Sequence, residues 1–181
     1  MRYPQLNAEH MSDRQRDVAA TIKQRYGGEL PAPFAAMLYS PEMAERTQSL
    51  GEFLQSGLKI PERLRILAVL ITAGRHRGSD LAEFKGLGSV KNALLNPEII
   101  SALEKGERPS TLREDERVVY DFCSALVAHG RVTSPVFEAL VEKLGRAAAL
   151  ELVAVCGYMT LLTNVLKVTK CSLSDGSVDV V

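Results

Sequence analysis

The side chains of this chain that could do chemistry are concentrated between Thr72 and Ser89, in the sequence TAGRHRGSDLAEFKGLGS. His76 is the member of this block whose ordinary pKa lies near neutrality, as proton transfer at physiological pH requires. Arg75 and Arg77 would lower that pKa if they approach the imidazole in space, which favours the neutral base. The alternative is an exposed histidine at a basic helix end, where positive charge complements the helix dipole.

Two carboxylates follow in the same block. Asp80 and Glu83 are three residues apart, so they share one face if this stretch is helical, and a carboxylate pair in a pocket can act as acid and base. The alternative is that Ser79 or Asp80 caps the next helix while Glu83 completes the capping arrangement. We take His76, Asp80 and Glu83 as the candidate catalytic residues.

Four further side chains form the candidate substrate-binding set. Arg75 and Lys85 would supply positive charge, and Lys85 could also act as an amine nucleophile if it is buried rather than exposed. The phenols of Tyr39 and Tyr158 could donate hydrogen bonds to a carbonyl or carboxylate of a ligand. Each could equally be a buried tyrosine whose hydroxyl bonds to the backbone.

The sequence contains no motif for a metal, a nucleotide or a dithiol. The GLGS stretch is not a phosphate-binding loop, because Lys91 stands where its last glycine is required and no strand precedes it. Cys123, Cys156 and Cys171 form no CxxC and no zinc spacing. We expect Cys123 and Cys156 to be small buried hydrophobes and Cys171 to be exposed in a polar tail. We therefore expect no metal, no cofactor and no resolving pair of thiols.

Charge and hydropathy exclude several classes of protein. The formal net charge is zero and the pI is about 6.8, so nothing resembles the basic footprint of a nucleic-acid binder. The N-terminus lacks the apolar region of a signal peptide, and the sparse cysteines suit a reducing compartment, so we expect a cytoplasmic protein. The apolar run Leu150 to Val168 contains Glu151, Asn164 and Lys167, which favours a core or interface helix over a membrane span.

Helix signals recur along the chain, and no alternating strand pattern does. Ser12-Asp13 predicts a helix to about Arg25, Ser40-Pro41-Glu42 a second to Gln55, and Ile60-Pro61-Glu62 a third. Later helices are expected over 98–105, from Thr111 to Gly130, over 136–144 and over 146–168. We predict one all-α domain spanning 1–181, a bundle of seven to nine helices. Its core covers about 30–170, with a peripheral arm 1–11 and tail 169–181.

Six blocks in order resemble one family: PAPFAAMLYSPEMAERTQSLGEFLQSG, IPERLRILAVLITA, ALLNPEIISAL, EDERVVYDFCSAL, GRVTSPVFEALVEKLG and ELVAVCGYMTLLTNVLKV. Together they are similar to the carboxymuconolactone decarboxylase family, whose fold is alkyl hydroperoxidase D-like. The resemblance covers roughly residues 30 to 170. It implies an all-helical subunit that assembles into homo-oligomers, as trimers or hexamers, with a dimer also possible.

The family resemblance also implies a site that this sequence does not carry. One branch uses a CxxC dithiol with a nearby His, and the other a Tyr-Glu-Trp-x-x-His block. Aligned backward from ALLNPEIISAL, Leu81, Ala82 and Glu83 occupy the Tyr-Glu-Trp positions and Gly86 the His position. Aligned forward from LITA, Leu81 falls at the Glu position and Lys85 at the His position. Neither register restores the Glu/His pair, so the catalytic residues of the family are assigned to no position.

Three functions remain open from the sequence. The first is a carboxymuconolactone decarboxylase-like protein that acts on or binds a small carbonyl or lactone-type metabolite in an interhelical pocket, with lyase, decarboxylase or isomerase chemistry. The second is a non-catalytic oligomeric ligand-binding or scaffold protein. The third, a thiol-dependent hydroperoxide reductase, is the weakest because the sequence shows no resolving pair and we expect the cysteines to be buried.

Overall fold

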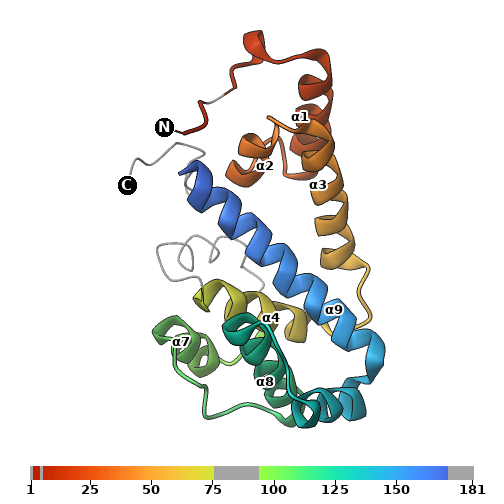
Figure 1. The fold of residues 1–181 in the computed structure, drawn as a ribbon, viewed down its shortest axis with the longest axis vertical. Helices are drawn as coiled ribbons and strands as arrows, with labels where there is room; N and C mark the ends of the chain where they lie inside the picture. The colour runs from red at the N-terminus through yellow and green to blue at the C-terminus, as the bar shows by residue number, and fades with distance from the viewer. Residues whose placement is uncertain (1, 5, 76–93, 171–181) are drawn as a thin grey trace. The chain divides into compact units, whose positions relative to one another are not determined.

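The structure, a computed structural model, describes residues 2–4, 6–75 and 94–170. Within these ranges it contains seven α-helices, one short 3-10 helix and no strand, which confirms the predicted all-α class. The elements, coloured along the chain in Figure 1, are η1 (Ala8–His10), α1 (Asp13–Arg25), α2 (Ala32–Met37), α3 (Pro41–Ser56), α4 (Glu62–Arg75), α7 (Pro97–Lys105), α8 (Glu114–His129) and α9 (Ser134–Thr169).

Local signals in the sequence account for where the helices begin and end. The Ser12 side chain accepts a hydrogen bond from the Gln15 backbone N–H, and the Gln15 side chain accepts one from the Ser12 N–H at 2.9 Å, which is a complete capping box. The Asn96 side chain accepts from the Glu98 N–H at 2.9 Å and starts α7. Gly106 ends that helix in the left-handed region, with φ 73°. Helix α2 was not predicted, because YGGELPAP indicated only a break.

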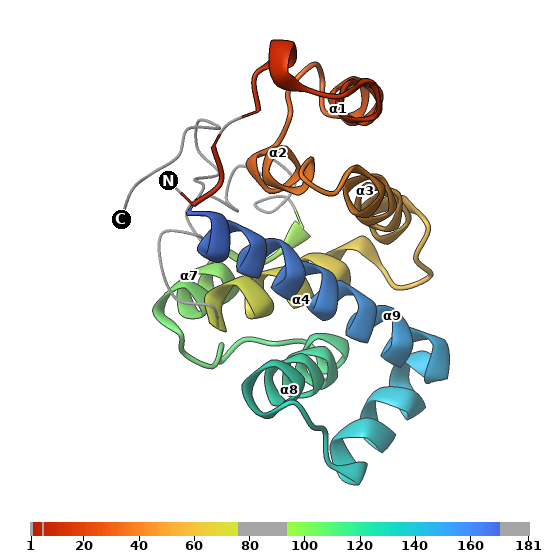
Figure 2. The same cartoon turned by 45° about the horizontal axis from the view of Figure 1, so that its top comes forward.

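The chain divides into two compact units. The first comprises Met1–Ser56 and Leu161–Val181, and the second comprises Gly57–Thr160. In the first unit α3 packs against α1 and α2 (Figure 2). Its core is apolar and closed to solvent, with Val18, Ile22, Phe34, Met37 and Leu38 each no more than 2% exposed.

The second unit is organised around α4, which packs against α7 and α8 (Figure 1). Fully buried side chains from α4, α8 and the α9 segment of this unit make its core: Leu64, Leu67, Ala68, Val119, Cys123 and Leu152. Each large apolar side chain that is buried in this way contributes about 1.5–3 kcal/mol through removal of its surface from water. Helix α4 is therefore the element on which the position of the others in this unit depends.

Helix α9 is long and apolar enough to cross a membrane by length and composition alone. An 18-residue window of it reaches a mean hydropathy of 1.6, and 44% of that window is buried inside the protein. Core helices of soluble proteins have the same length and hydropathy. The preference for a core helix over a membrane span therefore still rests on the polar side chains within the run. One of them, Glu151, has a structural role that is described below.

Gly145 breaks α9 near its start. Its φ of 84° and ψ of 166° lie in a region that side chains with a Cβ rarely enter, although no neighbouring atom lies within 4 Å of where a Cβ would stand. The sequence predicted two helices separated at this glycine. The structure has the same break, drawn as a kink within one element.

Replacement of Gly145 by alanine is expected to lower the free energy of unfolding by about 1–3 kcal/mol, because only the backbone conformation opposes it. Gly157 is the matched control. It lies on α9 in ordinary helical geometry with open space around it, so Gly157→Ala should be neutral or stabilise by up to about 1 kcal/mol. Urea unfolding followed by circular dichroism measures both. Equal effects of the two substitutions would contradict the assignment of strain to Gly145.

Candidate functional site

A buried ion pair fixes α4 against α8. The Arg63 guanidinium donates to the Asp115 carboxylate at 2.6 Å and to the Glu116 carboxylate at 2.8 Å. Glu116 is 2% exposed, and its other oxygen accepts the Arg113 backbone N–H at 2.8 Å. Because both oxygens of this carboxylate are occupied, the charge is compensated, and the registry of the two helices is set by a directional contact as well as by apolar packing.

The start of α4 is held from α9. The Glu151 carboxylate accepts the Lys59 backbone N–H at 3.1 Å through either oxygen and the Ile60 N–H at 3.0 Å. These N–H groups lie just before the first turn of α4, where the positive end of the helix dipole favours an anion. Glu151, the charge that argued against a membrane helix, is thus a cap that ties two distant segments of the second unit together.

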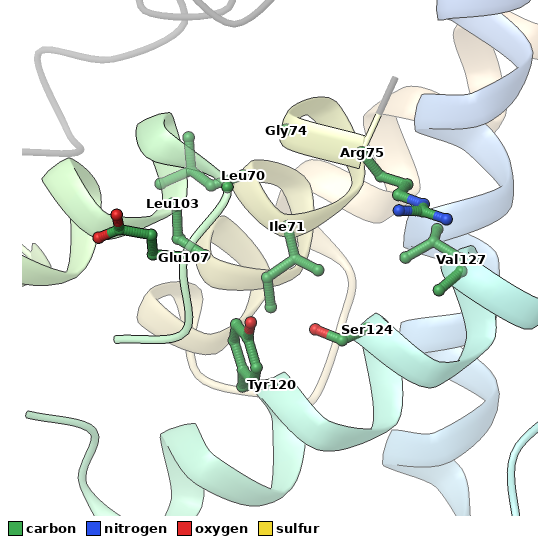
Figure 3. A pocket seen from close by; sticks show the side chains of 11 residues that line it. Leu70, Ile71, Gly74, Arg75, Leu103, Glu107, Tyr120, Ser124 and Val127 are labelled. Carbon is green, nitrogen blue, oxygen red and sulfur yellow. The ribbon is translucent and has the colours of Figure 1, made fainter. Parts of the chain in front are cut away.

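The second unit contains a cavity of about 180 Å³, partly open to solvent, on the opposite, C-terminal half of α4. Its walls come from α4, the end of α7 and α8 (Figure 3). The lining combines apolar and polar residues, and polar atoms contribute more of its surface than apolar ones. It comprises Leu70, Ile71, Gly74, Arg75, Leu103, Gly106, Glu107, Tyr120, Ser124, Val127 and Ala128. Concave sites that combine apolar walls with a few polar groups are typical of small-molecule sites.

Four polar side chains of the lining form no side-chain hydrogen bond and no ion pair with another described residue. The Tyr120 and Ser124 hydroxyls lie on neighbouring turns of α8 and point toward Ile71 of α4 (Figure 3). The Arg75 guanidinium and the Glu107 carboxylate belong to the same lining, and no described residue forms an ion pair with either. The lining of the cavity therefore includes a cation, an anion and two hydroxyls.

Arg108 supports the Tyr120 wall. Its guanidinium carbon lies 5.0 Å from the centroid of the Tyr120 ring, in cation–π contact, and it also pairs with the Asp121 carboxylate. The Asp121 hydrogen bond raises the pKa of Arg108, so its charge is retained at all ordinary pH values. This arrangement restricts the phenol ring while its hydroxyl stays available.

One predicted site residue lies in this cavity. Arg75, proposed for substrate binding, is the last residue of α4 and lines the pocket. His76, Asp80, Glu83 and Lys85 lie outside the described residues, so their roles stay predictions.

The two predicted tyrosines do not line this cavity. Tyr39 belongs to the first unit, is 44% exposed, and donates a hydrogen bond to the Pro4 carbonyl at 2.9 Å. Its ring meets that of Tyr3 edge-on, and both line a separate cavity of about 420 Å³ in that unit. Tyr158 lies half-buried on α9 in the second unit and is not among the residues of the α4–α8 cavity. The ligand roles of both tyrosines stay predictions.

Sequence reasoning missed Glu107, Tyr120 and Ser124. Tyr120 and Ser124 are four residues apart on α8, and Val127 and Ala128 continue the same face. That face of α8 lies beside its core face. The helical spacing of its tyrosine and serine is the sequence signal that could have identified it as a cavity wall. Glu107 follows a helix-ending glycine, and nothing in its local sequence distinguishes it from a surface carboxylate.

The two described cysteines lie in the core of the second unit. Cys123 and Cys156 are buried, at 0% and 2% exposed, as predicted. A side-chain hydrogen bond with Cys156, together with burial, raises the pKa of Cys123, and the same bond lowers the pKa of Cys156. The expectation that the cysteines form no resolving pair stays a prediction.

Solved structures show the same fold. A peroxidase-related protein from Ralstonia eutropha JMP134, described as an alkylhydroperoxidase AhpD core, aligns over 92% of this chain and 88% of its own, with a TM-score of 0.72 and 15% identity. The debrominase Bmp8 aligns with a TM-score of 0.72 and 17% identity in two structures. Its apo form covers 94% of this chain and 91% of its own. A Cys→Ala variant in complex with 2,3,4-tribromopyrrole covers 97% and 92%.

The chain has the alkylhydroperoxidase D fold. No protein-family model and no curated protein matches the sequence. At these identities the likeness establishes the fold alone. It agrees with the fold that the six sequence blocks implied. Among the described residues of this alkylhydroperoxidase D-like chain, no three His, Cys, Asp or Glu side chains gather as a metal site would require.

The Arg63→Met substitution is expected to cost about 3–5 kcal/mol of unfolding free energy, because it leaves the buried Glu116 carboxylate without its counter-charge. In Arg63→Met/Glu116→Gln the amide still accepts the Arg113 N–H, so the double variant should recover at least about 1 kcal/mol. Urea unfolding of the four proteins completes the cycle.

Arg65→Met is the control on the same helix. Its partner Glu62 is 54% exposed, so the change should stay below about 1 kcal/mol. Additive effects at 63 and 116 would refute the coupling.

Asp115 gives the second unit a defined sensitivity to acid. The Arg63 hydrogen bond holds the pKa of Asp115 below its ordinary value. A lowered folded-state pKa stabilises the protein above the unfolded pKa of about 3.9, and that stabilisation disappears as pH falls through the folded value. We expect the difference in unfolding free energy between the wild type and Asp115→Asn to be constant from pH 7 to 5 and to shrink below about pH 4. A difference that stays constant down to pH 2 would contradict this.

Proposed function

We propose that the α4–α8 cavity binds a small, partly apolar metabolite that carries a carbonyl or carboxylate, of the lactone type. The observation that carries the proposal is that one cavity is lined by Tyr120, Ser124 and the Arg75 guanidinium, which has no ion-pair partner among the described residues, beside apolar side chains of the same helices. The apolar walls would cover a ring of few atoms, while the guanidinium would hold a carboxylate and the hydroxyls a carbonyl oxygen.

The structural neighbours are consistent with this size of ligand. The debrominase Bmp8 has been crystallised with 2,3,4-tribromopyrrole, a single substituted ring. A cavity of about 180 Å³ suits a ligand of the same class. Only the size of the ligand is taken from this neighbour. The cavity residues on which the proposal rests belong to this chain.

The chemistry we propose for such a ligand is proton transfer next to its carbonyl. Removal of a proton from the adjacent carbon places negative charge on the carbonyl oxygen, where Arg75 and Tyr120 would stabilise it. The base would come from the residues that directly follow Arg75 in the sequence, with His76 and Glu83 as the first candidates and Asp80 and Lys85 as the others. Decarboxylation or isomerisation of a lactone could both proceed through this charge.

A non-catalytic ligand-binding member of the fold is the second function that we consider. In it Arg75, Tyr120 and Ser124 would still bind the ligand, but no proton would be exchanged.

Self-association is part of both proposals. Large exposed apolar side chains on the α9 segment of the second unit, Leu150 at 73% and Val153 at 42%, support it. A cytoplasmic location likewise stays a prediction.

Binding can be tested with 5-oxotetrahydrofuran-2-carboxylate as the probe and uncharged γ-valerolactone as its match. Arg75→Gln is expected to weaken binding of the carboxylate about tenfold and to leave the uncharged lactone unchanged, since a hydrogen bond to a charged group contributes about 1.5–3 kcal/mol. Tyr120→Phe should weaken both several-fold. Isothermal titration calorimetry measures each affinity.

The charge-matched control is Arg131→Gln, which removes an exposed arginine of the same unit. No saturable binding of either probe to the wild type would refute the proposed ligand class.

Catalysis can be separated from binding by deuterium incorporation. In D₂O the wild type is expected to accelerate exchange of the proton beside the lactone carbonyl, as followed by NMR, and His76→Ala or Glu83→Ala should abolish the acceleration. Binding without exchange would favour the non-catalytic alternative. Unchanged exchange in both variants would remove His76 and Glu83 from the mechanism.

A further inference from the structure

A second cavity, of about 420 Å³, lies in the first unit and has no role in the proposed function. Its walls come from the N-terminal segment, α2, the start of α3 and the end of α9, which can be followed in Figure 2. Most of its lining surface is apolar, and the cavity is open to solvent on one side. Small-molecule sites span about 300–1,000 Å³, so this cavity has room for a compound of one or two rings.

Exposed apolar side chains gather at this cavity. Ten large apolar or aromatic side chains are exposed among the described residues, and five of them line it: Tyr3 at 38%, Tyr39 at 44%, Met43 at 42%, Leu161 at 38% and Val168 at 52%. They come from three segments that are distant in the sequence, so the tertiary structure brings them together. Single exposed apolar side chains need no explanation, but a cluster of them around a hollow marks an interaction site.

The aromatic wall of the cavity is held by contacts within the chain. The Tyr39 hydroxyl donates a hydrogen bond to the Pro4 carbonyl at 2.9 Å, and its ring meets that of Tyr3 edge-on, with 5.2 Å between the ring centroids. Both contacts join the N-terminal segment to the residues just before α3. Because the Pro4 carbonyl already accepts the hydroxyl proton, Tyr39 contributes an aromatic surface to the lining rather than a hydrogen-bond donor.

No side chain that is charged at neutral pH lines this cavity. Its eleven lining residues include no Asp, Glu, Lys, Arg or His. The Ser40 hydroxyl and the Asn164 amide are polar and form no side-chain hydrogen bond with another described residue. The Thr169 hydroxyl bonds the Val165 carbonyl at 2.7 Å. Since removal of a charged group from water is costly without a counter-charge, this lining favours an uncharged ligand with one group for the Asn164 amide.

We propose that this cavity binds an uncharged aromatic compound that carries one carbonyl group. Its rings would lie against Tyr39, Met43 and Val168, where an aromatic ring and a flexible thioether both make favourable contacts with a second ring. The Asn164 amide would donate a hydrogen bond to the carbonyl oxygen. This inference does not depend on the proposed function, because no residue lines both cavities.

The probe for the test is 2-acetylnaphthalene, with 2-naphthoate as its charged match, applied to the full chain carrying ¹³C in its methionine methyl groups. We expect the ketone to shift the NMR signals of Met37 and Met43, which line the cavity, and to leave that of Met159, buried in the second unit, unchanged. The carboxylate should bind at least about tenfold more weakly. No saturable shift at Met37 or Met43 would refute the site, and equal affinity for both probes would refute the preference for an uncharged ligand.

Two glutamate substitutions on α3 form a matched pair. Met43 and Leu50 are equally exposed, at 42% and 43%, but only Met43 lines the cavity. We expect Met43→Glu to weaken binding of 2-acetylnaphthalene at least about tenfold and Leu50→Glu to change it less than about twofold. Asn164→Leu should weaken binding of the ketone several-fold and leave 2-ethylnaphthalene, which lacks the carbonyl, unchanged. Equal effects of the two glutamates would place the probe elsewhere and overturn the site.

A second copy of the chain is the other occupant that this apolar face could take, and sedimentation velocity separates the two. We expect Met43→Glu to sediment as the wild type does. If it dissociates an oligomer instead, while the probe leaves the Met37 and Met43 signals unchanged, the face is an interface and the ligand proposal is wrong. Arg75→Gln should bind 2-acetylnaphthalene with unchanged affinity, so this result is distinct from the outcome at the α4–α8 cavity.

Discussion

The contact of Arg63 with Asp115 and Glu116 is the constraint on which the second unit depends. Glu116 is closed to solvent, so its charge would be very costly without a partner. Arg63 supplies that partner from α4, and the Arg113 backbone N–H occupies the remaining oxygen. An apolar interface could slide by a helical turn at modest cost, but a bidentate pair accepts one registry only. This fixes which residues of α4 and α8 face each other farther along.

The position of the cavity follows from that registry. Farther along the two helices, residues 70–75 of α4 and 120–128 of α8 line the cavity together with the end of α7. Glu151 of α9 holds the start of α4, so a single helix is anchored at its beginning by α9 and along its side by α8. The same helices therefore support the cavity and the buried core of this unit.

The helices themselves could be predicted with little error. Ser12, Asn96 and Gly106 form caps that involve residues only a few positions away, so local sequence defines these helix ends. The break at Gly145 could likewise be predicted from the sequence, because a backbone with φ of 84° favours glycine whatever surrounds it. Helix α2 was missed because it is short and begins after a proline in a stretch of breakers, and packing of Phe34 and Met37 stabilises it rather than a local signal.

The site was less predictable, since its parts come from helices that are distant in the sequence. Arg75 could be named because it belongs to a conspicuous polar block, whereas Tyr120 and Ser124 are ordinary residues until α8 is placed against α4. The cysteines show the same limit. Their apolar neighbours determined that Cys123 and Cys156 would be buried, because burial follows from hydrophobic periodicity. Only the tertiary structure decided which residues of other helices surround them, because those contacts join helices that are distant in the sequence.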